Sequence, residues 1–112
     1  MNRRLAIVGI YCIECTSNNK KYVGSSIDVF VRWNGHLTLL LLNKHSNKQL
    51  QSDFNKYGYI SFKFTILELA PKNIKKEALL LLEQLYIDSI HKGNLYNTKR
   101  AIAKKSAKLK VG

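Results

Sequence analysis

Two apolar segments on either side of a short polar run constrain the fold more than any other feature of this sequence. Residues 5–13 and 21–23 are rich in β-branched and aromatic side chains, and residues 16–20 are types that favour turns. This pattern predicts a β-hairpin. With its loop centred near the start of the polar run, Tyr11 would stand opposite or diagonal to Tyr22 on one face of the sheet.

Gly9 and Gly24 flank the two tyrosines and suggest more than a plain hairpin. A glycine lowers the steric wall of a strand, so that a bulky ligand can approach the backbone closely. Tyrosine also favours strands for packing reasons alone, which makes Tyr11 and Tyr22 ordinary strand residues in the alternative interpretation. The hairpin therefore marks a candidate site without proving one.

The chain has 112 residues, of which 46% are hydrophobic, which suits one compact domain with one modest core. The sequence contains no apolar run of about 18 residues, so it predicts no membrane span. Residues 1–10 begin as a signal peptide does, but they lack a small-residue cleavage site and charged residues follow soon after. We expect an intracellular protein of the cytoplasm, nucleoid or organelle matrix that is not secreted.

The net charge is strongly positive. The formal value is +12, from 19 basic and 7 acidic residues. A field of this sign attracts polyanions, of which nucleic acid is the commonest. An acidic membrane surface is a weaker candidate because no basic amphipathic helix dominates the chain. A lysine-rich protein with no anionic partner is the remaining alternative.

Cys12 and Cys15 have the spacing of half a zinc site, but no second cysteine or histidine pair follows at a usual distance. A redox pair would normally lie at a helix N-terminus, whereas these two lie on a predicted strand. Residues three apart on a strand also point to opposite faces. We therefore expect two buried or half-buried thiols.

Residues 27–42 predict the first helix. Ser25 and Asp28 have the spacing of a capping box, which opens helices. Arg32 and His36 lie four residues apart and share one face, although each can also be an ordinary polar surface residue. The apolar stripe expected to face the core consists of Phe30, Trp33, Leu37 and Leu40 or Leu41.

The rest of the chain continues the pattern. A second helix is predicted at residues 48–56 with Gly58 as its C-cap, and a third strand with alternating apolar residues at 60–69. A third helix is predicted at residues 74–91, capped by Asn73 and with His91, Lys92 and Gly93 at its C-terminal end. The expected order is strand, strand, helix, helix, strand, helix.

Glu83 stands out in the last predicted helix because its neighbours one turn away are all apolar. Burying a carboxylate is costly unless a cation or hydrogen bonds compensate. Glu83 therefore needs a basic partner such as Arg32, or a metal ion, unless it lies at the edge of the apolar face and reaches water. After it, residues 95–98 can return to the sheet as an extended segment.

Residues 99–110 carry six basic and no acidic side chains. They allow a weakly packed helix that tracks phosphates or leads into a partner region, or simply a solvated tail. We expect a domain at residues 1–98 and a basic tail or linker at 99–112.

Five motifs follow one another along the chain: Gly9-Ile10-Tyr11, Lys21-Tyr22-Val23-Gly24-Ser25, Arg32-Trp33 with His36, Glu83, and Tyr96-Asn97. Taken together and in this order, they resemble the GIY-YIG nuclease family. The resemblance spans residues 9–97 and is closer to the phage and intron-homing branch than to repair-type members, partly through His45 and the stretch at 54–58.

The resemblance implies a small α/β (α+β) domain with a three-stranded antiparallel sheet flanked by helices. It also implies metal-dependent hydrolysis of phosphodiester bonds in DNA. Tyr11 or Tyr22 would act as general base, with His36 as a second candidate or proton relay. Arg32 would bind the phosphate oxygens, and Glu83 would hold a single Mg²⁺ (or Mn²⁺) ion. With one aligned carboxylate, a two-metal mechanism is disfavoured.

The resemblance extends to partners. Asn97 would orient a neighbour or a metal-bound water. Homing members usually carry a further DNA-binding region, and two copies can pair to cut both strands, so both are expectations here. The residues expected to contact DNA are Lys21, Ser25, His45, Lys99 and Arg100.

Two small departures from the family pattern are Val23, which replaces an isoleucine, and Gly35. Gly35 weakens the helix slightly but leaves room beside it, and it can loosen the geometry of Arg32 and His36. The rival interpretations are a non-catalytic nucleic-acid-binding module on the same fold and a purely structural domain. A pure binding module has no need for Glu83 inside an apolar stripe, nor for Arg32 and His36 one turn apart. The loss of a signature residue would suggest a structural domain, and none is lost.

Overall fold

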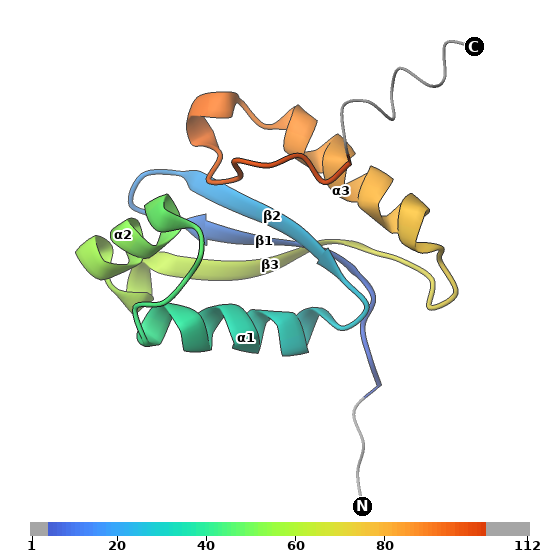
Figure 1. The fold of residues 1–112 in the computed structure, drawn as a ribbon, viewed down its shortest axis with the longest axis horizontal. Coiled ribbons are helices and arrows are strands. Elements are labelled where there is room, and N and C mark those ends of the chain that lie inside the picture. The colour runs from blue at the N-terminus through green and yellow to red at the C-terminus, as the bar shows by residue number, and fades with distance from the viewer. Residues whose placement is uncertain (1–4, 103–112) are drawn as a thin grey trace, which may run out of the picture.

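The fold is a three-stranded antiparallel sheet with helices on both faces, seen in a computed structural model that describes residues 5–102 (Figure 1). The strand order is β2-β1-β3, with β1 at Gly9–Cys15, β2 at Lys20–Ser26 and β3 at Phe62–Leu69. The central strand is thus the first strand of the predicted hairpin. The hairpin is confirmed, although β1 begins later and β2 runs longer than expected.

The register places the two tyrosines diagonally. Tyr11 pairs with Gly24, and Tyr22 pairs with Ile13 two residues along the same face. The ladder between β1 and β3 shifts register next to Tyr11. Such bulges re-aim side chains and are common beside active sites.

Three helices cover the sheet in the predicted order. α1 at Val29–Leu41 and α2 at Lys48–Tyr57 lie on one face, and α3 at Lys76–Ser89 lies on the other (Figure 1). Short 3₁₀ turns occur at Tyr59–Ser61 and Lys92–Asn94. Within residues 5–102, none of the helices has the length and apolar character that crossing a bilayer requires.

The core consists of two clusters separated by the sheet, because side chains alternate along β1. One cluster packs under α1 and α2 and includes Tyr11 and Ile13, and the other packs under α3 and includes Ile10. Cys12 and Cys15 are buried free thiols, as expected. Burial raises the pKa of the Cys12 thiol to about 11, so it remains protonated.

The helix caps differ from the predictions in two places. Asp28 precedes α1 without a side-chain cap, and the Ser25 hydroxyl is bonded to Glu83 instead, so the capping box is wrong. α3 begins after Lys75, not after Asn73. The Gly58 C-cap is confirmed, with a φ of 85° that L residues rarely adopt.

Most of the apolar stripe predicted for α1 is confirmed, because Trp33, Leu37 and Leu40 pack on the core. In α1 the buried residues are Val29, His36 and Leu40, while Phe30 is 42% exposed and Leu41 is also exposed. The buried face also includes His36, which is hydrogen-bonded to Tyr11 of the sheet, and the periodicity of apolar residues cannot reveal this contact.

The third strand and the third helix are both shorter than predicted. α3 ends at Ser89, so the predicted basic residues at its C-terminus lie beyond it. Residues 59–61 form a 3₁₀ turn before β3 rather than its beginning.

Candidate active site

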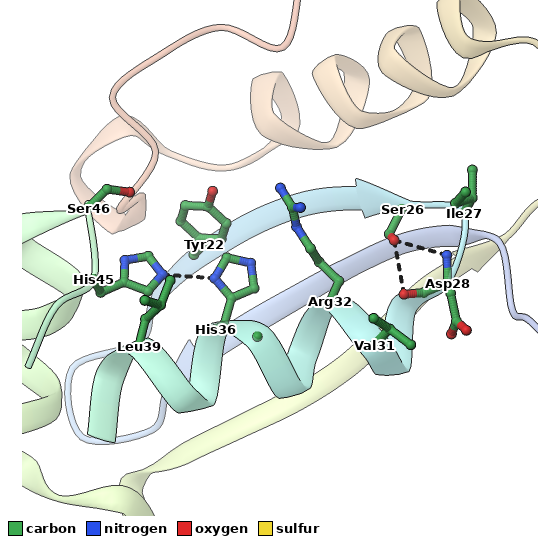
Figure 2. Close-up of a pocket in the computed structure, with 11 residues that line it drawn as sticks. Tyr22, Ser26, Ile27, Asp28, Val31, Arg32, His36, Leu39, His45 and Ser46 are labelled. Atoms are coloured by element: carbon green, nitrogen blue, oxygen red, sulfur yellow. Dashed lines mark hydrogen bonds between the residues drawn. The ribbon is translucent and has the colours of Figure 1, made fainter. Parts of the chain in front are cut away.

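The candidate site lies along the outer edge of β2. Tyr22 comes from β2 itself, Arg32 and His36 come from α1 on one face, and Glu83 comes from α3 on the other. Figure 2 shows Tyr22, Arg32 and His36 side by side, with the Arg32 side chain extending past β2. The structure therefore brings side chains from β2 and α1 together with one from α3, which is far from both in sequence.

A chain of hydrogen bonds leads from a backbone amide to Tyr11. The amide nitrogen of Asn47 is 3.0 Å from His45 Nδ1, and His45 Nε2 is 2.8 Å from His36 Nδ1. His36 Nε2 is in turn 2.7 Å from the Tyr11 hydroxyl oxygen. The two rings are only 8% and 5% exposed.

The direction of each hydrogen bond follows from the amide. Because the Asn47 N–H can only donate, His45 Nδ1 accepts, and the neutral ring carries its proton on Nε2. That proton is donated to His36 Nδ1, so the His36 proton lies on Nε2 and is donated to Tyr11. His36 is therefore a hydrogen-bond donor to the phenol oxygen rather than an acceptor of its proton.

Both histidines are neutral near pH 7. Burial lowers the pKa of His36 to about 4, and the neighbouring His45 and Arg32 lower it further in the same direction. Burial also lowers the pKa of His45. Neutral rings are what the tautomer assignment requires.

Two residues that the sequence analysis did not identify hold this series of hydrogen bonds in place. Gln51 accepts from the His45 backbone N–H at 3.0 Å and donates to the Leu40 carbonyl. The Asn47 side chain caps α2 and also donates to the Tyr96 carbonyl at 2.7 Å. An asparagine directly before a predicted helix is an N-cap signal. No sequence signal marks Gln51.

Tyr11 fills the space that Gly24 leaves. A Cβ at position 24 would overlap the Tyr11 ring, and a Cβ at position 9 would overlap the Glu68 backbone. The expectation that these two glycines admit a ligand is therefore wrong, since the protein itself occupies both spaces. Gly24 is required for Tyr11 to lie across β2.

The two phenols have raised pKa values. Burial raises the pKa of Tyr11 well above its usual value, and the neighbouring Tyr22 raises it further, against the hydrogen bond and charge of Arg32. Burial and Glu83 raise the pKa of Tyr22, against the charge of Arg32. Both tyrosines are protonated near pH 7.

Glu83 is half-buried and accepts a hydrogen bond from the Ser25 hydroxyl. Burial raises the pKa of Glu83, while the Ser25 hydrogen bond and the charge of Arg32 lower it. Among the residues that the structure describes, Glu83 forms no ion pair, and no group of three potential metal-ligating side chains occurs. A lone half-buried carboxylate fits a hard divalent cation that keeps most of its waters, as Mg²⁺ does.

The basic residues expected near DNA fall into two groups. Lys99 and Arg100 are exposed and line a cavity of about 240 Å³ together with Tyr22 and Glu83. Lys21 points to the other face of the sheet from Tyr22 and lies 3.7 Å from Glu14. The structure thus brings Lys99 and Arg100 to the site but not Lys21.

Three other predicted site residues make contacts within the chain. The Asn97 amide pairs with both the N–H and the C=O of Val23 at 2.8 Å, which fixes the segment after α3 to β2. The Ser25 hydroxyl donates a hydrogen bond to Glu83, and His45 is buried against His36. Each of these side chains is therefore hydrogen-bonded to another part of the chain, and His45 is also buried.

Comparisons with known proteins place most of this chain in a family. A model of the GIY-YIG catalytic domain matches residues 7–97. A protein named "Probable intron-encoded endonuclease 1" from Neurospora crassa is 45% identical over 101 residues, which is 88% of this chain and 32% of that protein. "Intron-associated endonuclease 1" of Enterobacteria phage T4 is 41% identical over 90 residues, which is 80% of this chain and 36% of that protein.

Solved structures agree with the sequence relatives. A variant of the catalytic domain of intron endonuclease I-TevI superimposes with a TM-score of 0.76 at 38% identity, covering 86% of this chain and 97% of that one. A second structure of the catalytic domain of homing endonuclease I-TevI gives 0.74 at 39% identity, covering 82% and 98%. The chain spans about a third of the length of the two curated relatives, and nearly all of the solved catalytic domain.

Proposed function

The chain belongs to the GIY-YIG catalytic domain family, and from this premise we propose that it is a DNA endonuclease module of the homing or mobile-element type. It would hydrolyse phosphodiester bonds with the help of one divalent ion. The observation that carries the proposal is the meeting of a phenol, a guanidinium and a carboxylate at the β2 edge. These are Tyr11, Arg32 and Glu83.

Arg32 is suited to hold the scissile phosphate. It extends from α1 past β2 (Figure 2). Its positive charge acts to lower the pKa of Tyr11, Tyr22 and Glu83. A guanidinium presents a fork of N–H donors to the non-bridging oxygens, and these hydrogen bonds strengthen as negative charge develops. Arg32 therefore orients the phosphate next to the Tyr11 oxygen.

Tyr11 is the proposed general base, and His36 is the donor that supports it. The Tyr11 oxygen receives hydrogen bonds from His36 Nε2 and from Arg32. Two donors stabilise a phenolate, which can take the proton of an attacking water. His36, with its proton already on Nε2 and a pKa of about 4, is poorly suited to the same task.

Glu83 is the proposed ligand of the metal ion, Mg²⁺ or Mn²⁺. Its bond to Ser25 holds the carboxylate in place beside β2. When bound, a divalent ion supplies positive charge that stabilises the leaving oxygen. The remaining coordination positions would be taken by water and the phosphate.

Lys99 and Arg100 would bind the DNA backbone beside the site, in keeping with the net charge of +12. Because the curated relatives are about three times as long as the stretch they share with this chain, sequence recognition by a separate region is part of the proposal. Pairing of two copies and the domain boundary at residue 98 stay predictions.

A plasmid-nicking assay tests the proposal. Parent protein is compared with Glu83→Gln and Arg32→Lys at low salt, with and without Mg²⁺. We expect metal-dependent cleavage that falls about 10³-fold in each variant, the scale of losing one group that stabilises the transition state. Metal-dependent DNA binding without cleavage by the parent, across substrates, would instead support the non-catalytic binding module.

A further inference from the structure

A groove of about 610 Å³ runs along α1 next to the proposed catalytic residues. One side of it is an apolar stripe of residues four positions apart: Ile27 is 74% exposed, Val31 is 61% exposed and Leu39 is 41% exposed. Figure 2 shows Val31 and Leu39 on the same helix as Arg32 and His36. Gly35 occupies the position of the stripe between Val31 and Leu39 and also lines the groove.

No contact within residues 5–102 explains why position 35 is a glycine. A glycine in a helix interior destabilises the fold by about 1 kcal/mol relative to alanine. Gly9 and Gly24 are explained by the atoms that a Cβ would overlap, and Gly58 by its φ of 85°. A Cβ at position 35 would meet no atom within 4 Å. The space above Gly35 is open, and it opens into the groove.

We propose that this groove, the α1 groove, holds the deoxyribose face of the DNA strand that carries the scissile phosphate. The inference rests on the proposed function. The opposite side of the α1 groove is formed by Tyr22, Arg32 and His36, so a strand whose phosphate lies on Arg32 continues directly into it. Sugars present apolar C–H faces that suit Val31 and Leu39, and Gly35 lets a sugar approach the helix backbone.

Charge and access favour this occupant over a second protein copy. A chain with a net charge of +12 repels its own copies and attracts a polyanion. A second copy seated in the groove would also cover Arg32. Asp28 lies at one end of the groove, away from His45 and Ser46 at the other, so we expect the strand to run from Arg32 toward His45.

The test fills the groove without touching the catalytic groups. Gly35→Leu and Gly35→Ala are made in the Glu83→Gln background, so that binding of a labelled DNA duplex is measured by anisotropy without cleavage. Both substitutions improve helix propensity, so neither should lower the melting temperature. Ala78→Leu, which adds bulk at an exposed position of α3 outside the groove, is the matched control.

We expect Gly35→Leu to weaken DNA binding about tenfold and Gly35→Ala less, while Ala78→Leu stays within about twofold. The slope of log affinity against log salt should be the same for parent and Gly35→Leu, because the lost contact is apolar and releases no counterions. A Lys99→Ala, Arg100→Ala double variant should instead flatten that slope.

Unchanged DNA affinity in Gly35→Leu would overturn the inference, as would a dimer in gel filtration that Gly35→Leu dissociates without affecting DNA binding. Failure of the proposed function looks different. In that case the protein with Glu83 intact binds DNA without cleaving it, whatever residue stands at position 35. If Gly35→Leu proves unstable, Gly35→Ala alone decides the question.

Discussion

The two walls of the site, one on each face of the sheet, are built differently. The tyrosine–histidine wall consists of Tyr11, His36 and His45, all buried and joined by hydrogen bonds of 2.7 and 2.8 Å. The carboxylate wall consists of Glu83 with Lys99 and Arg100, and only Glu83 is even half-buried. The tyrosine–histidine wall is held in place by its own hydrogen bonds before substrate binds, whereas the carboxylate wall is exposed to solvent and ligands.

This difference matches the chemistry proposed for each wall. Proton transfer depends on atoms held at hydrogen-bond distance, and preorganised donors need no rearrangement during the reaction. A hydrated cation and a DNA backbone tolerate more variation in position. We therefore expect substitutions in the tyrosine–histidine wall to act mainly on the rate of cleavage, and those in the carboxylate wall on metal or DNA affinity.

Among the substitutions that compare the two walls, Tyr11→Phe should have the largest effect on the rate of cleavage. The substitution removes only the phenol oxygen, and the ring still packs over Gly24. We expect cleavage to fall about 10³-fold, within the range for loss of a general base, with DNA affinity unchanged. Single-turnover cleavage beside anisotropy measures both. A variant as active as the parent would remove Tyr11 from the mechanism.

The pH dependence of cleavage distinguishes Tyr11 from His36 as the base. Because burial raises the pKa of Tyr11, phenolate is scarce at neutral pH, and the rate should rise about tenfold per pH unit, or about 100-fold from pH 6.5 to 8.5. A base with the His36 pKa of about 4 would already be fully deprotonated there. A flat profile at saturating metal would therefore favour His36.

His45→Ala tests whether the tyrosine–histidine wall works as a unit. The substitution leaves His36 Nδ1 without its donor and the Asn47 N–H without its acceptor. We expect a stability loss of about 1–3 kcal/mol and about a tenfold loss of rate. His45→Gln, whose amide offers both a donor and an acceptor, should recover part of the rate.

The outcome can be read spectroscopically. In ¹⁵N-edited spectra of the parent, His36 and His45 should both appear as neutral rings with the proton on Nε2. In His45→Ala, His36 should show a mixture of tautomers. A single unchanged His36 tautomer in that variant would mean that Asn47 and His45 do not set its orientation.

The fold could be predicted from the sequence largely because it rests on local signals. The apolar run at residues 5–13, the alternation at 60–69, the turn residues between the first two strands, and Gly58 each act within a few positions. Helix starts were less predictable, because Ser25 has two available partners. Its hydroxyl bonds to Glu83 across 58 residues rather than to the helix it precedes.

Several side chains of the candidate site could be selected from the sequence, but the hydrogen bonds between them could not. The apolar surroundings of Glu83 marked it as a residue that needs compensation, and the structure places it half-buried beside Ser25. In contrast, nothing in the spacing of His36 and His45 shows that one donates to the other. That bond depends on how α1 and the loop before α2 close on the sheet.

Ser25→Ala should have the smallest effect, and it tests the open wall. The Ser25 hydroxyl donates to Glu83 and lowers the pKa of that carboxyl, against the effect of burial. Its loss removes a hydrogen bond to a charged group, which is worth about 1.5 kcal/mol or roughly tenfold in affinity, less where water replaces it. We therefore expect Mg²⁺ titrations of cleavage to shift about fivefold to higher concentration, with the rate at saturating metal nearly unchanged.

Tyr11→Phe provides the contrast for this titration, since it should lower the rate without shifting the metal dependence. If Ser25→Ala instead lowers the rate at saturating Mg²⁺ as strongly as Tyr11→Phe does, the carboxylate wall is as preorganised as the other. The distinction between a fixed wall and an open one would then fail. A shift in metal dependence with a preserved maximal rate places Ser25 as the residue that holds Glu83 ready for the ion.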